Sequence, residues 1–201
     1  MLREHWESVH RLKQDAELSW FEDRPAWSLE IVRSLPRVPR SAIDVGGGQS
    51  AFAGELLQLG VETVTVLDAS SEALQRGRAQ LGADAARIDW KEGNILEASD
   101  LGPFELWHDR ACLQFLTDGA DRRRYCEIAG RSIVSGGFAI IAGFAPDGPE
   151  LCGGLPVRRS SAEAIAAELS PAFTLSRSVQ SVHVTPWGSR QAFEHVLLRR
   201  N

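Results

Sequence analysis

Apolar positions spaced by three and four residues open the chain and indicate an amphipathic helix from Glu4 to about Trp20. The positions on this apolar face are Trp6, Val9, Leu12, Ala16 and Trp20. A second helix is predicted from Pro25, which suits a first helical turn, to a point before Pro36. These helices, within residues 1–40, are expected to form a cap on the main body.

Beyond residue 40, short apolar runs typical of buried strands alternate with segments of helical periodicity. Strands are predicted at residues 42–45, 64–68, 86–93, 104–109 and 136–144, and helices at 50–59, 70–81 and from Ala111 onwards. A further helix, capped by Ser160 or Ser161, precedes two strands at 173–184 and 192–200. This alternation predicts an α/β, doubly wound fold with helices on both faces of a parallel sheet.

Composition limits the number of domains and the kind of partner, but it does not indicate a function. A length of 201 residues, with 43% hydrophobic and 24% charged residues, predicts one globular domain spanning 1–201 and no separate substrate domain. The net charge of -5 argues against a nucleic-acid partner.

The cysteines and the apolar segments indicate the cellular compartment and whether a metal site is expected. Cys112, Cys126 and Cys152 are odd in number and widely spaced, which favours neither a disulfide framework nor a zinc site, so no metal is expected. The N-terminal segment carries charges throughout, and no apolar run reaches the roughly 18 residues of a membrane span. These features predict a cytoplasmic protein that does not contact a membrane.

The segment SAIDVGGGQS, residues 41–50, is the most informative part of the chain. Burying an unpaired carboxylate is costly, so Asp44 within an apolar strand is expected to have a partner. Gly46, Gly47 and Gly48 let the backbone turn and approach a ligand closely. Read as GxGxxA with Ala51, the same glycines also satisfy the dinucleotide pattern of nicotinamide or flavin domains.

The DxGxG form, with Asp44 two residues before the first glycine, resembles the class I S-adenosylmethionine-dependent methyltransferases. The resemblance implies a Rossmann-like, doubly wound, seven-stranded sheet whose last strand is antiparallel, with an N-terminal helical lid. It implies S-adenosyl-L-methionine as cofactor, with its methionine moiety on the glycine turn. Asp68, with Ala69, would hold the ribose, although Asp68 would also suit a cap for the helix near Ser70.

Asn94 and Ile95 follow the third predicted strand, where the same resemblance places contacts to adenine. Many methyltransferases carry aspartate at the first of these positions, so Asn94 is a departure, and a simple turn asparagine is the alternative. Trp20 and Phe21 are interpreted as a lid over the cofactor that excludes water, or else as core packing of the first helix.

The segment WHDR, residues 107–110, resembles the thiopurine-methyltransferase-like branch of this class, with His108 as an extra residue. That resemblance places Asp109 and Arg110 between the cofactor methyl and the acceptor, with Arg110 gripping an anionic or aromatic group. His108 is a candidate general base. The alternatives are a helix N-cap for Asp109, an ion pair of Arg110 with Asp44 or Asp109, and a polar loop residue for His108.

Other histidines and pocket candidates carry weaker patterns. Trp187 and Gln191 near the last turn, with Cys152, are candidate pocket-wall residues. His5 and His10 are expected to be solvated on the first helix.

We therefore expect methyl transfer to a small-molecule acceptor, namely a thiol, selenol, metalloid or other heteroatom nucleophile. A protein lysine acceptor is the alternative within the class. A nicotinamide-dependent oxidoreductase and a non-catalytic cofactor-binding module are the alternatives outside it.

Overall fold

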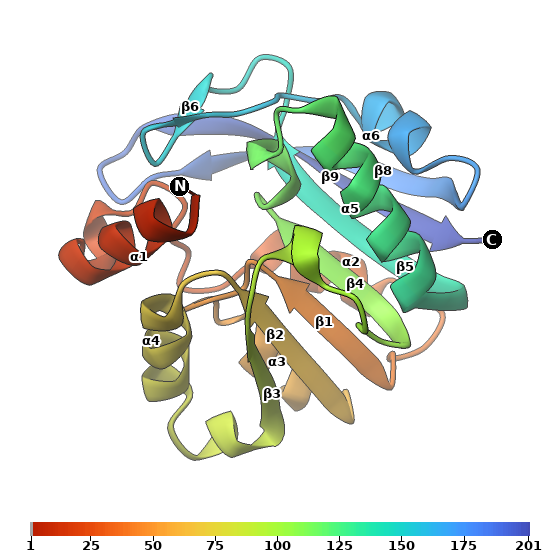
Figure 1. Cartoon of the computed structure of the whole chain (residues 1–201), viewed down its shortest axis with the longest axis horizontal. Coiled ribbons are helices and arrows are strands. Elements are labelled where there is room, and N and C mark those ends of the chain that lie inside the picture. Colours follow the sequence, from red (N-terminus) through yellow and green to blue (C-terminus); the bar gives the residue numbers. More distant parts are fainter. Residues whose placement is uncertain (1) are drawn as a thin grey trace.

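A seven-stranded sheet with helices on both faces forms the centre of the computed structural model, which describes residues 2–201 (Figure 1). The strand order is β3-β2-β1-β4-β5-β9-β8. These strands are β1 (Ser41–Val45), β2 (Thr63–Asp68), β3 (Ile88–Glu92), β4 (Phe104–Arg110), β5 (Ile133–Phe144), β8 (Phe173–Val184) and β9 (Arg190–Arg200). A separate small hairpin consists of β6 (Leu151–Cys152) and β7 (Leu155–Pro156).

Strand directions confirm the predicted fold class. Strands β1 to β5 pair in parallel, whereas β9 pairs antiparallel with both β5 and β8. The last strand of the chain is thus inserted between β5 and β8 as the return arm of a hairpin. In the register of β1 and β4, Asp44 lies beside His108 and Val45 beside Asp109.

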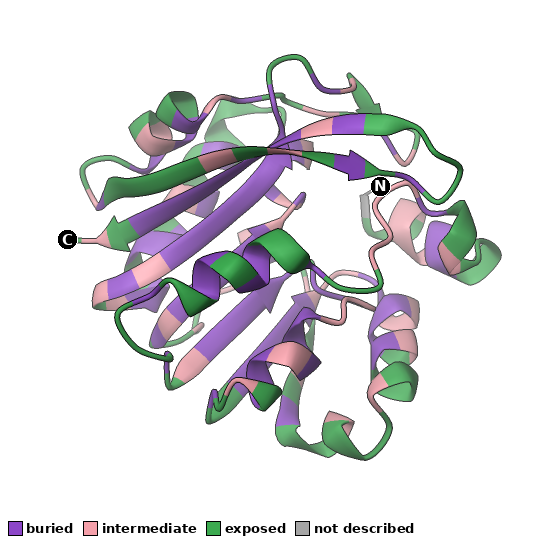
Figure 2. Cartoon of the chain, turned by 180° about the vertical axis from the view of Figure 1, so that it is seen from behind, coloured by how far each residue is buried: buried purple, intermediate pink, exposed green. Residues whose placement is uncertain are grey.

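The helices divide between the two faces because neighbouring strand residues point to opposite sides. Ile140 packs with α2 and α3, while Ile141 packs with α5 and α6. Figure 2 shows the central strands buried between helices whose outer surfaces are exposed. The helices are α1 (Leu2–Leu12), α2 (Ala26–Arg33), α3 (Phe52–Gln58), α4 (Ser71–Leu81), α5 (Gly119–Ser132) and α6 (Ala162–Leu169), with short 3-10 turns η1 (Asp15–Glu17), η2 (Gly82–Arg87), η3 (Ile95–Glu97) and η4 (Leu113–Phe115).

The first helix is shorter than its apolar periodicity predicts. It ends at Leu12, so Trp20, which is half-buried, lies in a turn after η1. The side chain of Glu17 accepts a hydrogen bond from the Gln14 backbone N–H, which starts a new turn there instead of continuing α1. The helical periodicity therefore fails beyond Leu12: Ala16 is exposed, and Leu18, outside the predicted apolar face, is fully buried.

Side-chain caps mark the starts of α4, α5 and α6. Ser70 and Ser161 each accept a backbone N–H three residues on, as expected for α4 and α6. The helix expected from Ala111 begins instead at Gly119, because Asp118 caps its first turn. Ala111 itself has a φ of 73°, which is incompatible with a right-handed helix.

Of the two helices expected in the cap, α1 lies with the segment that follows it over the carboxyl ends of the strands, near the N label in Figure 1. Glu7 ties α1 to the start of α4 by accepting hydrogen bonds from Ser70 Oγ and Ser71 Oγ, both at 2.7 Å. Helix α2, expected in the same cap, packs instead on the sheet face, where Leu29 is fully buried.

Candidate active site

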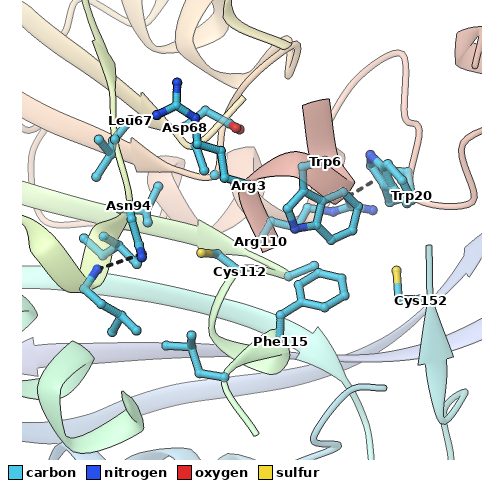
Figure 3. A pocket seen from close by; sticks show the side chains of 18 of the residues that line it. Arg3, Trp6, Trp20, Leu67, Asp68, Asn94, Arg110, Cys112, Phe115 and Cys152 are labelled. Carbon is cyan, nitrogen blue, oxygen red and sulfur yellow. Dashed lines mark hydrogen bonds between the residues drawn. The ribbon is translucent and has the colours of Figure 1, made fainter. Parts of the chain in front are cut away.

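Two cavities with shared lining residues lie at the carboxyl ends of the central strands, beneath α1. Figure 3 shows the larger one. The larger cavity has a volume of about 180 Å³ and the smaller cavity about 90 Å³. Both are lined by His10, Trp20, Gly46, Asp68 and Arg110. Ligands in doubly wound sheets bind outside the carboxyl ends of the strands, so these cavities are the candidate site.

The glycine turn after β1 forms one wall and leaves no room for side chains. Gly46 and Gly48 have φ values of 69° and 28°, in the region that favours glycine. A Cβ on Gly47 would lie 2.5 Å from Asp44 Oδ2, and one on Gly48 would lie 2.8 Å from Asp68 Oδ2. The turn therefore presents bare backbone to the smaller cavity.

Asp68 ends β2 and lines both cavities. Its Oδ1 accepts the backbone N–H of Ser70 at 2.8 Å, so the capping interaction considered from the sequence is present. Burial raises the pKa of Asp68 from 3.8 to about 6, against the lowering effect of the Ser70 and Gly48 backbone hydrogen bonds. A carboxylate has about four acceptor positions, so capacity remains for ligand hydroxyl groups.

Ala69, Asn94 and Ile95 line the larger cavity beside Asp68. Asn94 Oδ1 accepts the backbone N–H of Leu96 at 3.1 Å, and its amide nitrogen donates to Glu97 at 3.3 Å. The turn role considered for Asn94 is therefore present at a residue that also forms the cavity wall. Ile95 and Leu96 supply the apolar surface on which a planar ring would pack.

Asp44 has the partner that its burial requires, and that partner is His108. Asp44 Oδ1 lies 2.6 Å from His108 Nδ1, and His108 Nε2 lies 2.8 Å from Ser28 Oγ on α2. The imidazole stacks on Phe52 with ring centroids 3.8 Å apart. Asp44 Oδ2 is buried beside Gly47 with no hydrogen-bond partner among the described residues.

This geometry differs from the expectation that His108 faces an acceptor. His108 lines the smaller cavity, but the residue is 1% exposed and both ring nitrogens already have partners within the fold. His108 therefore supports the strand that carries Asp44, and neither nitrogen has a lone pair or proton directed at a ligand.

Asp109 also lies away from its expected position. It is fully buried and lines neither cavity. Its Oδ1 accepts the backbone N–H of Cys112 at 2.8 Å, and its Oδ2 accepts the Tyr125 hydroxyl at 2.5 Å. Burial raises its pKa to about 6, opposed first by the hydrogen bond from Tyr125. Because His108 and Asp109 are successive strand residues, they point to opposite faces, and Asp109 anchors the turn after β4.

Arg110 lines both cavities, as expected, but its charge partner is neither Asp44 nor Asp109. Its Nη1 donates to the backbone carbonyl oxygen of Trp20 at 3.0 Å, and its Nη2 lies 2.9 Å from Glu22 Oε1. The guanidinium lies 5.1 Å from the Phe193 ring centroid. Arg110 thus fixes the Trp20 segment to the end of β4.

The opposite wall, here called the lid wall, consists of Trp6, His10, Trp20, Phe115 and Cys152. Trp6 makes edge contacts with Trp20 and Phe115 at centroid distances of 5.5 and 4.8 Å. These rings gather on the side of the cavity away from Leu67 and Asn94 (Figure 3). The expectation that Trp20 covers the site therefore agrees with its place in the wall.

Several residues of this wall carried no signal in the sequence. His10, expected to be solvated, is only 7% exposed. Trp6 was predicted only as a member of the apolar face of the first helix, and Phe115 was not singled out. Trp187, by contrast, is 56% exposed, and neither it nor Gln191 is among the residues lining the two cavities. Phe21 lines only the smaller cavity.

The residues fit a cationic nucleoside cofactor. Three acids, Glu22, Asp44 and Asp68, line the smaller cavity, and Asp44 keeps an unpaired carboxylate oxygen at the glycine turn. A ligand ammonium would supply the positive charge and the hydrogen-bond donor that this oxygen lacks.

Across residues 2–201, no three His, Cys, Asp or Glu side chains gather as a metal site. The same residues include no helix that is long and apolar enough to span a membrane.

Comparisons with known proteins agree with this geometry. Residues 42–137 match a family model described as a methyltransferase domain. No curated protein matches the sequence. The N-methyltransferase NodS from Bradyrhizobium japonicum, solved with S-adenosyl-L-homocysteine, superposes with a TM-score of 0.73 at 19% identity, covering 98% of each chain.

Two further solved structures share the fold. A Burkholderia thailandensis 1,6-didemethyltoxoflavin-N1-methyltransferase has a TM-score of 0.79 at 19% identity, covering 100% of this chain and 87% of its own. TehB from Haemophilus influenzae has a TM-score of 0.69 at 14% identity, covering 88% and 62%. At these identities the neighbours establish the fold, and the family match covers the segment that carries the glycine turn, Asp68 and WHDR.

Proposed function

We propose that this chain, a class I S-adenosylmethionine-dependent methyltransferase, transfers the methyl group to a heteroatom of a small, planar acceptor held against the lid wall. The observation that carries the proposal is that the two cavities share five lining residues and that aromatic side chains from α1 and its following segment cover the larger one. An acceptor there would lie within reach of a cofactor bound on the glycine turn.

On the donor side, Asp68 would accept hydrogen bonds from the ribose hydroxyls, while Asn94 and Ile95 would contact the adenine. The turn from Gly46 to Gly48 would hold the methionine moiety, with Asp44 supplying negative charge beneath it. When bound, the cofactor supplies an electrophilic methyl group on a positively charged sulfur. The work left to the protein is to align the acceptor and keep water out.

On the acceptor side, the wall favours a ring that is neutral or anionic. Among the described residues lining the larger cavity, Asp68 is the only acid, whereas Arg3 and Arg110 are cationic. A lysine ammonium would meet no second carboxylate there, and the Trp6 cover leaves no long acidic groove for a protein segment. These features support a small molecule over a protein lysine.

The acceptor atom is the finer part of the proposal. The WHDR segment resembles the thiopurine-methyltransferase-like branch, which supports a soft acceptor such as a thiol, a selenol or a metalloid. The named neighbours NodS and the toxoflavin enzyme are N-methyltransferases, so nitrogen belongs among the acceptors tested.

Calorimetric titration tests the donor, and labelled methyl transfer tests the acceptor. We expect tight binding of S-adenosylhomocysteine and no binding of NADH. Label from S-adenosylmethionine is expected in small thiols, selenols or nitrogen heterocycles and absent from the protein fraction of a lysate. Binding of NADH alone would refute the methyltransferase proposal, and label confined to protein would refute the small-molecule acceptor.

A further inference from the structure

His10 occupies a position where the cofactor side and the acceptor side of the site meet. It belongs to α1, is 7% exposed and lines both cavities. Trp20 of the lid wall contacts its ring edge-on at a centroid distance of 6.1 Å. Because Gly46, Asp68 and Arg110 line the same two cavities, His10 faces the region between the glycine turn and the lid wall.

A chain of hydrogen bonds fixes which nitrogen of His10 carries a proton. Gln49 Nε2 donates to Asp15 Oδ1 at 2.9 Å, which sets the orientation of the Gln49 amide. Gln49 Oε1 then faces His10 Nδ1 at 3.2 Å, and a carbonyl oxygen only accepts. Nδ1 is therefore the protonated nitrogen, and Nε2 carries a lone pair with no hydrogen-bond partner in residues 2–201.

The surroundings keep this imidazole in its neutral form at neutral pH, so that Nε2 is not already protonated. Burial lowers the pKa of His10 below 6.5, opposed mainly by the Gln49 hydrogen bond. The charged groups around it come from α1, α4 and the two strand ends, namely Glu7, Glu72, Arg76, Asp68 and Arg110. Arg76 lowers the pKa of His10, while Glu7 and Glu72 raise it.

We propose that His10 Nε2 accepts the proton released by the acceptor during methyl transfer, with Gln49 and Asp15 as positioning residues. The inference rests on the proposed function. The acceptor's lone pair forms a bond to the methyl carbon, and the methyl–sulfur bond breaks with its electron pair going to sulfur. The acceptor's proton passes to Nε2, and the resulting imidazolium returns it to water once the product has left.

The other histidines of the fold do not offer this lone pair. Both nitrogens of His108 are hydrogen-bonded within the sheet. His183 binds Glu22 and the Ser19 carbonyl oxygen, and His195 is not among the residues lining the two cavities. His5 Nε2 donates to the Gly153 carbonyl oxygen at 2.9 Å, and His5 lines neither cavity.

The test uses His10→Asn, because the shorter amide retains a donor toward Gln49 and removes Nε2. His5→Asn, on the same helix, is the matched control. The probes are thiophenols and phenols of graded pKa, with label from S-adenosylmethionine. For acceptors that are protonated at the assay pH we expect His10→Asn to lower turnover about 100-fold. For acceptors that are already ionised the loss stays below about threefold, because no proton needs to leave.

Two readouts separate this role from a structural one. S-adenosylhomocysteine affinity should stay within about twofold in His10→Asn, and nitrogen NMR of the wild type should show the proton of His10 on Nδ1. Gln49→Leu should give mixed tautomers and an intermediate rate loss. Equal losses for ionised and protonated acceptors, or a proton on Nε2, would overturn the inference.

Other results would refute the proposed function itself. A wild-type enzyme without affinity for S-adenosylhomocysteine would refute the methyltransferase proposal itself. One that binds it, yet methylates no thiol, phenol or amine, would refute the acceptor class and the role of His10 together.

Discussion

One wall of the larger cavity comes from residues that directly follow strands, whereas the lid wall comes from segments that are far apart in the sequence. Asp68 and Asn94 sit at the ends of β2 and β3, in places set by the register of the sheet. Trp6, Phe115 and Cys152 reach the lid wall from α1, η4 and the β6 hairpin. The first wall is as rigid as the sheet, while the second depends on α1 staying docked.

Two histidines border the cavities, and they are held in opposite ways. His108 lines only the smaller cavity and is enclosed by β1, α2 and Phe52, with both nitrogens used inside the protein. His10 is held at Nδ1 only and lines both cavities. The comparison teaches that the histidine next to the sequence motif supports the fold, whereas the one with capacity for chemistry comes from the cap.

Replacing His108 should give the largest change and should affect stability first. His108→Leu leaves Asp44 and Ser28 buried without their partner, at a cost of about 3 kcal/mol in the free energy of unfolding. Urea unfolding monitored by circular dichroism measures it. His108→Asn, which keeps a donor for Asp44, should recover part of the loss. If His108→Leu were as stable as the wild type, the buried network would have no supporting role.

Asp68→Ala should affect binding more than stability. Removing two charged hydrogen bonds to the ribose should weaken S-adenosylhomocysteine binding about 100-fold, close to 2.7 kcal/mol. Isothermal titration calorimetry measures the change. Asp84→Ala is the control, because Asp84 pairs with Arg87 on the surface and should leave affinity unchanged. An unchanged affinity in Asp68→Ala would place the ribose elsewhere.

The contrast between the walls also explains what the sequence could predict. Strand alternation, the glycine turn and the acid at the end of β2 are local patterns, and parallel strands bring their carboxyl ends together. The fold class and the methyltransferase class were therefore predicted correctly. The burial of Asp44 also predicted a partner, although the register that makes it His108 appears only in the sheet.

The lid wall has no comparable pattern. Trp6 and His10 look like ordinary members of an amphipathic helix until α1 docks over the strand ends. Asp109 was misplaced although the predicted strand, 104–109, already contained it. Alternation along the strand directs its side chain to the face opposite His108, where the Cys112 backbone and Tyr125 bind it.

The pH dependence of cofactor binding sharpens the assignment of Asp68. Its pKa is raised by burial to about 6, so the carboxyl group is protonated below that value and accepts fewer hydrogen bonds. Affinity for S-adenosylhomocysteine should rise about tenfold from about pH 5 to pH 7 as the group ionises. Asp68→Asn should bind weakly with no such rise. A rise that persists in Asp68→Asn would assign the titration to another group.

The smallest effect is expected on the lid wall, where Trp6→Ala removes the ring that contacts Trp20 and Phe115. S-adenosylhomocysteine binding should change less than about threefold, because the strand-end wall is untouched, while the acceptor's KM should rise about fivefold, close to 1 kcal/mol of lost contact. Trp27→Ala, outside both cavities, controls for the loss of a tryptophan. Steady-state kinetics on an acceptor found by labelling, with calorimetry of the donor, separate the two quantities. If both affinities fell together, the walls would not act independently, and α1 would have to be regarded as part of the cofactor site.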